Sequence, residues 1–89
     1  MSKTIYVNCT VSQGLFESEF YITVRDSSAY VDRVNVKVTQ SPENGDEVEG
    51  KVIAYLVEET GDQALIELPG EPAAGGLRAW VPRADLVFA

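Results

Sequence analysis

Residues 45–88 read GDEVEGKVIAYLVEETGDQALIELPGEPAAGGLRAWVPRADLVF. This stretch opens with a long segment, 47–59, in which apolar residues recur at every second position. A turn at 60–62 leads into a second strand at 64–68, and a third strand follows at 77–81. Alternation with period two is typical of β-strands rather than helices. We expect these three strands to organise the sheet on which the rest of the chain packs.

Proline and glycine mark where the strands of this half end. Residues 69–76, PGEPAAGG, are rich in both and predict a flexible loop. Pro82 has no N–H to donate to a strand ladder, so the last strand is expected to end there. A single helical turn is predicted over residues 82–86, after which Val87 and Phe88 return to the sheet.

The first half of the chain predicts three more strands, at residues 4–11, 15–25 and 33–40. Residues 26–32 interrupt the alternation and predict a loop or a single helical turn. Residues 41–45, SPENG, are the strongest turn signal in the chain. No internal sequence repeat is evident. The residues expected to face the core are Ile5, Val7, Cys9, Val11, Phe16, Phe20, Ile22, Val24, Tyr30, Val34, Val36, Val38, Val48, Val52, Ala54, Leu56 and Phe88.

Five or six short strands predict one all-β domain over residues 1–89, built on a small, strongly bent antiparallel sheet. The order of a long strand, turn, strand, loop, strand, Pro-led turn and final strand resembles the end of an SH3-like barrel. Residues 79–86, AWVPRADL, carry this resemblance. Peptide-binding SH3 domains place a tyrosine three residues after the proline, where this chain has Asp85, so binding of proline-rich peptides is not implied. An OB-like barrel is the alternative, because GDEVEGKV at 45–52 resembles the opening strand of some OB folds.

Composition argues against several classes of function. The formal net charge is −7, from 14 acidic and 7 basic residues, which disfavours nucleic-acid binding. No apolar run approaches the roughly 18 residues needed to span a bilayer, so no membrane association is expected. The single cysteine, Cys9, permits no internal disulfide, and the N-terminus lacks the pattern of a signal peptide. We therefore expect a cytoplasmic protein.

Reactive groups are scarce. The chain has no histidine, which removes the commonest general base and metal ligand. Cys9 falls among apolar residues, where a thiol is inert. The acidic residues do not follow the spacing of a calcium loop, and the glycines do not follow that of a phosphate loop. We predict no catalytic residue, no metal site and no cofactor.

The candidate site comes from the aromatic residues. Tyr6, Tyr21, Tyr55 and Trp80 fall on the opposite parity to the expected core in four different strands. Residues of that parity gather on the outer face of a sheet, and exposed apolar patches mark interaction surfaces. With acidic residues around them, the expected partner is a basic peptide, a cationic ligand or a second copy of the chain.

The sequence therefore predicts a small non-enzymatic binding or self-association module. Two alternatives remain open at this point. One is an enzyme whose site forms only in a homo-oligomer, and the other is a nucleic-acid-binding barrel, which the net charge disfavours.

Overall fold

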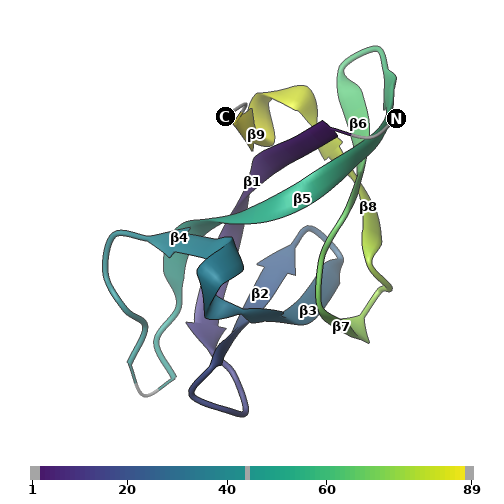
Figure 1. Ribbon diagram of the computed structural model, residues 1–89. Coiled ribbons are helices and arrows are strands. Elements are labelled where there is room, and N and C mark those ends of the chain that lie inside the picture. The colour runs from purple at the N-terminus through teal and green to yellow at the C-terminus, as the bar shows by residue number, and fades with distance from the viewer. Residues whose placement is uncertain (1–2, 44, 88–89) are drawn as a thin grey trace.

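Strands account for most of the structure, a computed structural model that describes residues 3–43 and 45–87 (Figure 1). The two helical elements are single 3-10 turns, and no helix among the described residues is long and apolar enough to cross a membrane. The elements in order are β1 (Lys3–Gln13), β2 (Glu19–Val24), β3 (Ser27–Asp32), η1 (Arg33–Asn35), β4 (Val36–Val38), β5 (Val48–Thr60), β6 (Gln63–Glu67), β7 (Glu71–Ala74), β8 (Arg78–Pro82), η2 (Arg83–Asp85) and β9 (Leu86–Val87).

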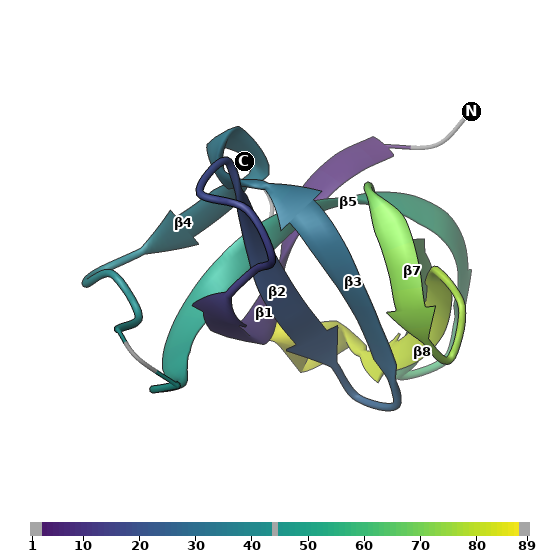
Figure 2. The same ribbon diagram turned by 90° about the horizontal axis from the view of Figure 1, so that it is seen from below.

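The described strands form one antiparallel sheet in the order β7-β3-β2-β1-β5-β6-β8, with β4 added on β5 and β9 on β1. The sheet curls strongly into a half-barrel (Figure 2). The prediction of an all-β, strongly bent antiparallel sheet is confirmed. The expected count of five or six strands is wrong, since the described residues form nine. The expected turn at Pro82 is also confirmed, because η2 begins at Arg83.

The core lies inside the curl and follows the predicted alternation along the two long central strands. β1 and β5 pair over nine positions, from Lys3 with Leu56 to Val11 with Val48. This pairing places the apolar face of each strand inward, where burial of aliphatic side chains stabilises the sheet. The buried apolar residues are Ile5, Val7, Cys9, Val11, Phe20, Ile22, Val24, Ala29, Val31, Val36, Val52, Ala54, Leu56, Ala64, Ile66, Leu68, Val81 and Leu86.

Phe16 was expected in the core and is 69% exposed. The strand predicted from residue 15 begins only at Glu19, and the preceding residues form the connection from β1. A hydrogen bond from the Glu19 N–H to the Phe16 carbonyl, at 3.2 Å, closes this turn. Phe16 therefore lies outside the alternating pattern that its neighbour Phe20 obeys.

Residues 26–32, predicted as a loop or helical turn, instead contain the whole of β3. A two-residue connection joins β2 to β3, with Val24 paired to Ser27 and Arg25 at φ 55°. Ala29 and Val31 point inward, so Tyr30 points outward rather than into the core. Val34, also expected inside, is 85% exposed because the chain forms η1 there before β4 starts.

The predicted flexible loop, 69–76, contains the short strand β7, which pairs with β3. All four β7 residues are exposed, so backbone pairing rather than apolar burial holds this strand. Gly70 and Gly75 bracket it, at φ +92° and +72°. A Cβ on Gly70 would lie 2.2 Å from the Tyr30 carbonyl oxygen, so only glycine lets the chain pass this close to β3.

The chain folds as two units with the same order of elements. The first is β1-β2-β3-η1-β4, and the second is β5-β6-β8-η2-β9, with β7 inserted. In each unit the last strand pairs with the first strand of the other unit. The expectation that the chain lacks a repeat holds for the sequence but not for the structure.

The register of the sheet follows an approximate two-fold between these units. Val7 of β1 pairs with Val52 of β5, and each of these two residues also pairs with the last strand of the other unit. Val7 pairs with Leu86 of β9, and Val52 pairs with Val36 of β4. Contacts related in both directions are the mark of two-fold symmetry. The backbone bonds repeat as well: the Arg33 N–H donates to the Ser18 carbonyl at 3.1 Å, and the Arg83 N–H donates to the Asp62 carbonyl at 2.8 Å. The predictions for Asn44 and Phe88 fall outside the described residues.

Candidate functional site

The outer face of the strands β1, β5, β6, β8 and β9 carries a set of apolar side chains. Tyr6 on β1 lies opposite Ile53 on β5 and opposite Val87 on β9. Tyr55 follows Ile53 on the same face of β5, and Leu65 on β6 pairs with Trp80 on β8. We name this surface the aromatic band, made of Tyr6, Ile53, Tyr55, Val57, Leu65, Trp80 and Val87.

Four of the seven band residues are exposed, and Tyr6, Ile53 and Leu65 are half-buried. Tyr55 and Trp80 each expose 46% of their surface, and Val57 and Val87 are also exposed. The register of the β5–β6 pairing shifts between Leu56 and Glu58, so Val57 has no partner residue on β6. An extra residue of this kind re-aims its side chain, and here it adds an apolar group to the outer face.

Tyr21, the fourth predicted site residue, is not part of the band. It pairs with Ser12 near the end of β1 and with Tyr30 on β3. The Tyr21 and Tyr30 rings stack in a tilted arrangement with centroids 5.2 Å apart. By the two-fold, these two tyrosines occupy the positions of Leu65 and Trp80. The structure thus places Tyr6, Tyr55 and Trp80 on the outer face of β1, β5 and β8, and it places Tyr21 on β2, on the other side of β1 from β5.

Two carboxylates on β5 and β6 are paired with arginines. The Glu67 carboxylate accepts from the Arg78 Nε at 2.9 Å, and Arg83 Nε lies 3.2 Å from Glu59 Oε1. These exposed pairs contribute little to stability, but they cancel charge locally. The expected acidic surroundings therefore do not extend to the part of the band around Trp80, where only Glu58 faces Leu65 without such a partner among the described residues.

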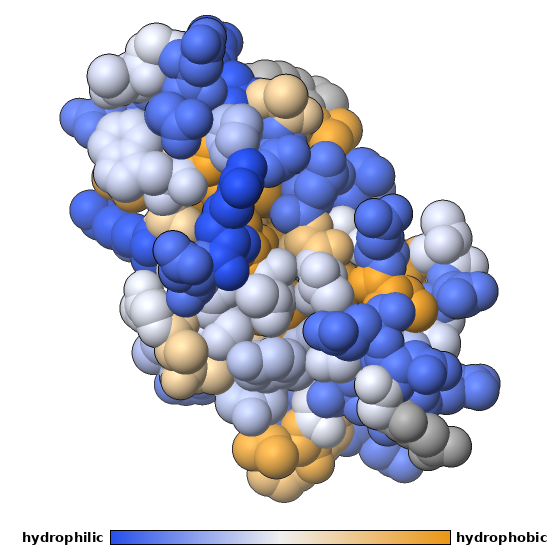
Figure 3. All heavy atoms as spheres, turned by 180° about the vertical axis from the view of Figure 1, so that it is seen from behind, coloured by the Kyte–Doolittle hydropathy of each residue, from blue (hydrophilic) through white to orange (hydrophobic). Residues whose placement is uncertain are grey.

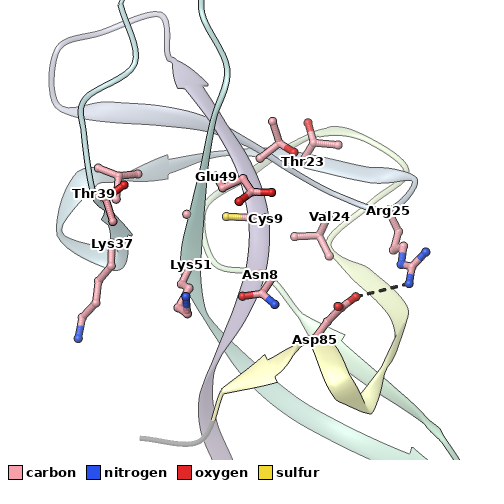
Figure 4. A pocket seen from close by; sticks show the side chains of 13 residues that line it. Asn8, Cys9, Thr23, Val24, Arg25, Lys37, Thr39, Glu49, Lys51 and Asp85 are labelled. Atoms are coloured by element: carbon pink, nitrogen blue, oxygen red, sulfur yellow. Dashed lines mark hydrogen bonds and ion pairs between the residues drawn. The ribbon is translucent and has the colours of Figure 1, made fainter.

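The polar counterpart of the band is a groove of about 730 Å³ (Figure 4). It lies at the point along β1 where the pairing with β9 ends and the pairing with β2 begins. The Arg25 guanidinium and the Asp85 carboxylate, 3.4 Å apart, form part of its wall. The Lys37 amine points away from Cys9 and lies 4.6 Å from the centroid of the Tyr6 ring. The remaining lining includes Asn8, Thr10, Thr23, Val24, Val38, Thr39, Glu49, Gly50 and Lys51.

The two-fold relates this groove to part of the band. The equivalent positions are Lys37 and Val87, Lys51 and Tyr6, Asn8 and Ile53, and Thr10 and Tyr55. Symmetry-related positions of the sheet are therefore polar in the groove and apolar in the band. The scaffold does not require apolar side chains on this face.

Cys9 is the one reactive group at the groove. Its sulfur lies between the Asn8 and Glu49 side chains in Figure 4. Burial raises the pKa of the Cys9 thiol from 9.0 to about 12, and the Lys51 ammonium opposes this rise. A thiol with such a pKa is protonated at neutral pH and is a poor nucleophile. Over residues 3–43 and 45–87, no group of His, Cys, Asp and Glu side chains could hold a metal ion.

A second exposed apolar feature was missed by the sequence reasoning. Leu15 and Phe16, 72% and 69% exposed, project from the β1–β2 connection. Val34 of η1 lies on the neighbouring segment, which the Arg33–Ser18 hydrogen bond joins to that connection. We name Leu15, Phe16 and Val34 the apolar tip. Hydrophobic atoms project at the lower end of the molecule in Figure 3, where this connection lies in Figure 1.

Comparison of the chain with protein-family models, with curated proteins and with solved structures finds no match.

Proposed function

We propose that the protein is a non-enzymatic interaction module that associates with a second copy of itself through the aromatic band. The observation that carries this proposal is the contrast between the groove and the band. Four positions that are polar in the groove are apolar at their equivalents in the band, so packing within the sheet does not account for Tyr6, Ile53, Tyr55 and Val87. An exposed apolar surface of this kind is typical of a protein–protein interface.

The charge of the protein does not prevent a second copy from meeting the band at close range. The formal net charge of −7 repels two copies at long range. Salt screens that repulsion over a Debye length of about 8 Å at physiological ionic strength. Close to the band, Glu67 and Glu59 are paired with arginines, so two bands can meet without burying several unpaired carboxylates.

The finer description of the fold that we propose is an SH3-like half-barrel built twice. Three successive strands, a 3-10 turn and a final strand that returns to a long strand form both units. This is the order that residues 79–86 suggest for the second half. The order supports an SH3-like arrangement over an OB-like one.

A cationic ligand is the second candidate, and one contact favours it. The chain's own Lys37 ammonium already lies over the Tyr6 ring, 4.6 Å from its centroid. Aromatic faces attract cations, with about 0.5–1 kcal/mol at exposed sites. The exposed rings of Tyr55 and Trp80 offer the same face to an external lysine or arginine.

Sedimentation of the native protein and of Trp80→Ala over a range of concentrations tests the proposal. Truncation of a central aromatic residue in an interface costs about 2 kcal/mol, which weakens association about 30-fold. We expect the native protein to form a dimer with rising concentration and the variant to stay monomeric at the concentrations where the native protein pairs.

Tyr21→Ala is the matched control, because Tyr21 is an outward aromatic residue that lies off the band. It should dimerise like the native protein. A native protein that stays monomeric at every concentration contradicts the proposal. Equal weakening by Tyr21→Ala and Trp80→Ala would also contradict it, because the loss would then not be specific to the band.

A further inference from the structure

The β1–β2 connection differs from its counterpart in the second unit. Between the last paired residues, Gln13 with Phe20, the first unit has six residues, 14–19. Between Thr60 and Gln63, the second unit has only Gly61 and Asp62. Both connections are fastened in the same way, by a hydrogen bond from the first N–H of the following 3-10 turn. The longer connection is therefore an addition that the scaffold does not need.

The added residues carry an unusual pair of side chains for a turn. Leu15 and Phe16 are among the most exposed large apolar residues described, and Val34 on η1, the segment that the Arg33–Ser18 hydrogen bond joins to this connection, is exposed as well. The residue equivalent to Val34 in the second unit is Ala84. Both in the connection between its first two strands and in its 3-10 turn, only the first unit presents large apolar groups to solvent. Exposure of these apolar side chains to water is unfavourable, and contact with an apolar partner surface would remove them from water.

Acidic residues surround this tip. Glu17 lies in the connection itself, and Glu19 is directly opposite Asp32 in the β2–β3 ladder. Two like charges in that position destabilise a sheet. The nearby Arg33 guanidinium lies over the Phe20 ring, 4.3 Å from its centroid, and no ion pair joins Arg33 to a carboxylate among the described residues. The tip therefore combines exposed apolar groups with net negative charge, because Glu17, Glu19 and Asp32 outnumber Arg33.

The neighbouring connection adds charge at the same end of the sheet. The Gln13 side-chain amide donates to the Pro42 carbonyl at 3.2 Å, which holds the β4–β5 connection against the end of β1. That connection contributes Glu43, Asp46 and Glu47. A surface of this composition complements a partner that offers apolar side chains among lysines and arginines.

We propose that the apolar tip, with its acidic surroundings, docks a basic polypeptide segment that presents apolar side chains between its cationic residues. The partner inserts its apolar side chains against Leu15, Phe16 and Val34, and its cations face Glu17, Glu19 and Asp32. This binding is separate from association through the aromatic band. The tip and the band share no residue.

Fluorescence anisotropy of short labelled peptides tests this inference. A helical peptide of leucine and lysine should bind the native protein. A lysine–serine peptide, which keeps the charge but lacks apolar groups, should bind at least about tenfold more weakly. A leucine–glutamate peptide, which reverses the charge, should also bind at least about tenfold more weakly. Failure of the leucine–lysine peptide to bind the native protein overturns the inference, as does equal binding of all three.

Variants then locate the binding. The double change Leu15→Ser and Phe16→Ser alters exposed residues of a turn and should leave the fold intact while weakening the leucine–lysine peptide about tenfold or more. Glu17→Gln with Glu19→Gln should weaken it and reduce its dependence on salt. Trp80→Ala is the control and should bind the peptide as the native protein does. Undiminished binding by the serine variant, or loss of binding in Trp80→Ala, refutes docking at the tip.

Sedimentation of the same variants separates the two proposals. The serine variant should still form the dimer proposed for the aromatic band, and Trp80→Ala should still bind the peptide. Each proposal can therefore fail while the other stands.

Discussion

Substitution of Gly70 by alanine should destabilise the protein by more than the cost of placing an alanine at a positive φ. Gly70 has φ +92°, and a Cβ there would lie 2.2 Å from the Tyr30 carbonyl oxygen. An alanine at positive φ costs about 1–2 kcal/mol. Ordinary contact with that oxygen also requires the chain to move by more than 1 Å, since van der Waals contact begins near 3.4 Å. Displacement of β7 from β3 by this amount disrupts hydrogen bonds worth about 1 kcal/mol each.

We expect Gly70→Ala to lower the free energy of unfolding by about 3–4 kcal/mol, if two such bonds are lost. Gly61→Ala is the matched control. Gly61 also has a positive φ, +59°, but a Cβ there meets nothing within 4 Å. The control should lose only about 1–2 kcal/mol. The difference of about 2 kcal/mol corresponds to roughly 8–16 °C in the melting temperature of a domain of this size.

Thermal and urea unfolding, followed by circular dichroism and by the fluorescence of the single tryptophan, measure both variants. Equal losses in Gly70→Ala and Gly61→Ala would refute the reasoning. That result would mean that the chain at Gly70 does not pass against the Tyr30 carbonyl and that β7 is not held on β3 as described.

Two further predictions concern buried polar groups. Ser27→Ala removes a hydroxyl that lies 3.2 Å from the Gly75 carbonyl oxygen and 3.4 Å from that of Arg78, and it should lower the free energy of unfolding by about 1 kcal/mol in urea titrations. The Cys9 thiol has a pKa raised from 9.0 to about 12 in the folded state, so the folded protein holds the proton more tightly than the unfolded chain. The stability this contributes is present below pH 9 and is lost as the pH rises from 9 towards 12; Cys9→Ala should have a flatter stability profile across that window, and a profile as steep as that of the native protein would show that Cys9 is not responsible.

The faces of the long strands could be predicted from the sequence because burial alternates strictly along them. Ile5, Val7 and Val11 on β1 face the core as expected, and so do Val52 and Leu56 on β5. The Pro82 turn was also predictable, because proline ends a ladder whatever surrounds it. These features depend on the local chain and on the period of the strand alone.

The missed elements depend on backbone contacts rather than side-chain patterns. β7 has only exposed residues and is held by pairing with β3, which no periodicity reveals. The β2–β3 connection places Arg25 at φ 55° without the glycine or asparagine that normally marks such a turn. Because that turn was not predicted, β3 was read as a loop and the parity of Tyr30 was assigned to the wrong face.

The candidate site was predictable only in part for the same reason. Outward parity could be assigned to Tyr6, Tyr55 and Trp80 within their own strands. Which of them share a surface depends on strand order, and strand order separates Tyr21 from the other three. The two-fold between the units lies in the register and the backbone bonds, so the contrast between the polar groove and the apolar band could be drawn only from the structure.

The fluorescence emission of Trp80, measured from low micromolar to millimolar protein, tests the central claim most directly. Trp80 is the only tryptophan of the chain and lies in the aromatic band, 46% exposed. If the band is covered by a second copy, the indole leaves water on association. We predict that the emission maximum shifts to shorter wavelength with rising concentration, along the same curve as the dimer measured by sedimentation. An emission maximum that stays constant while the protein dimerises would contradict the claim, because the band would then remain in water.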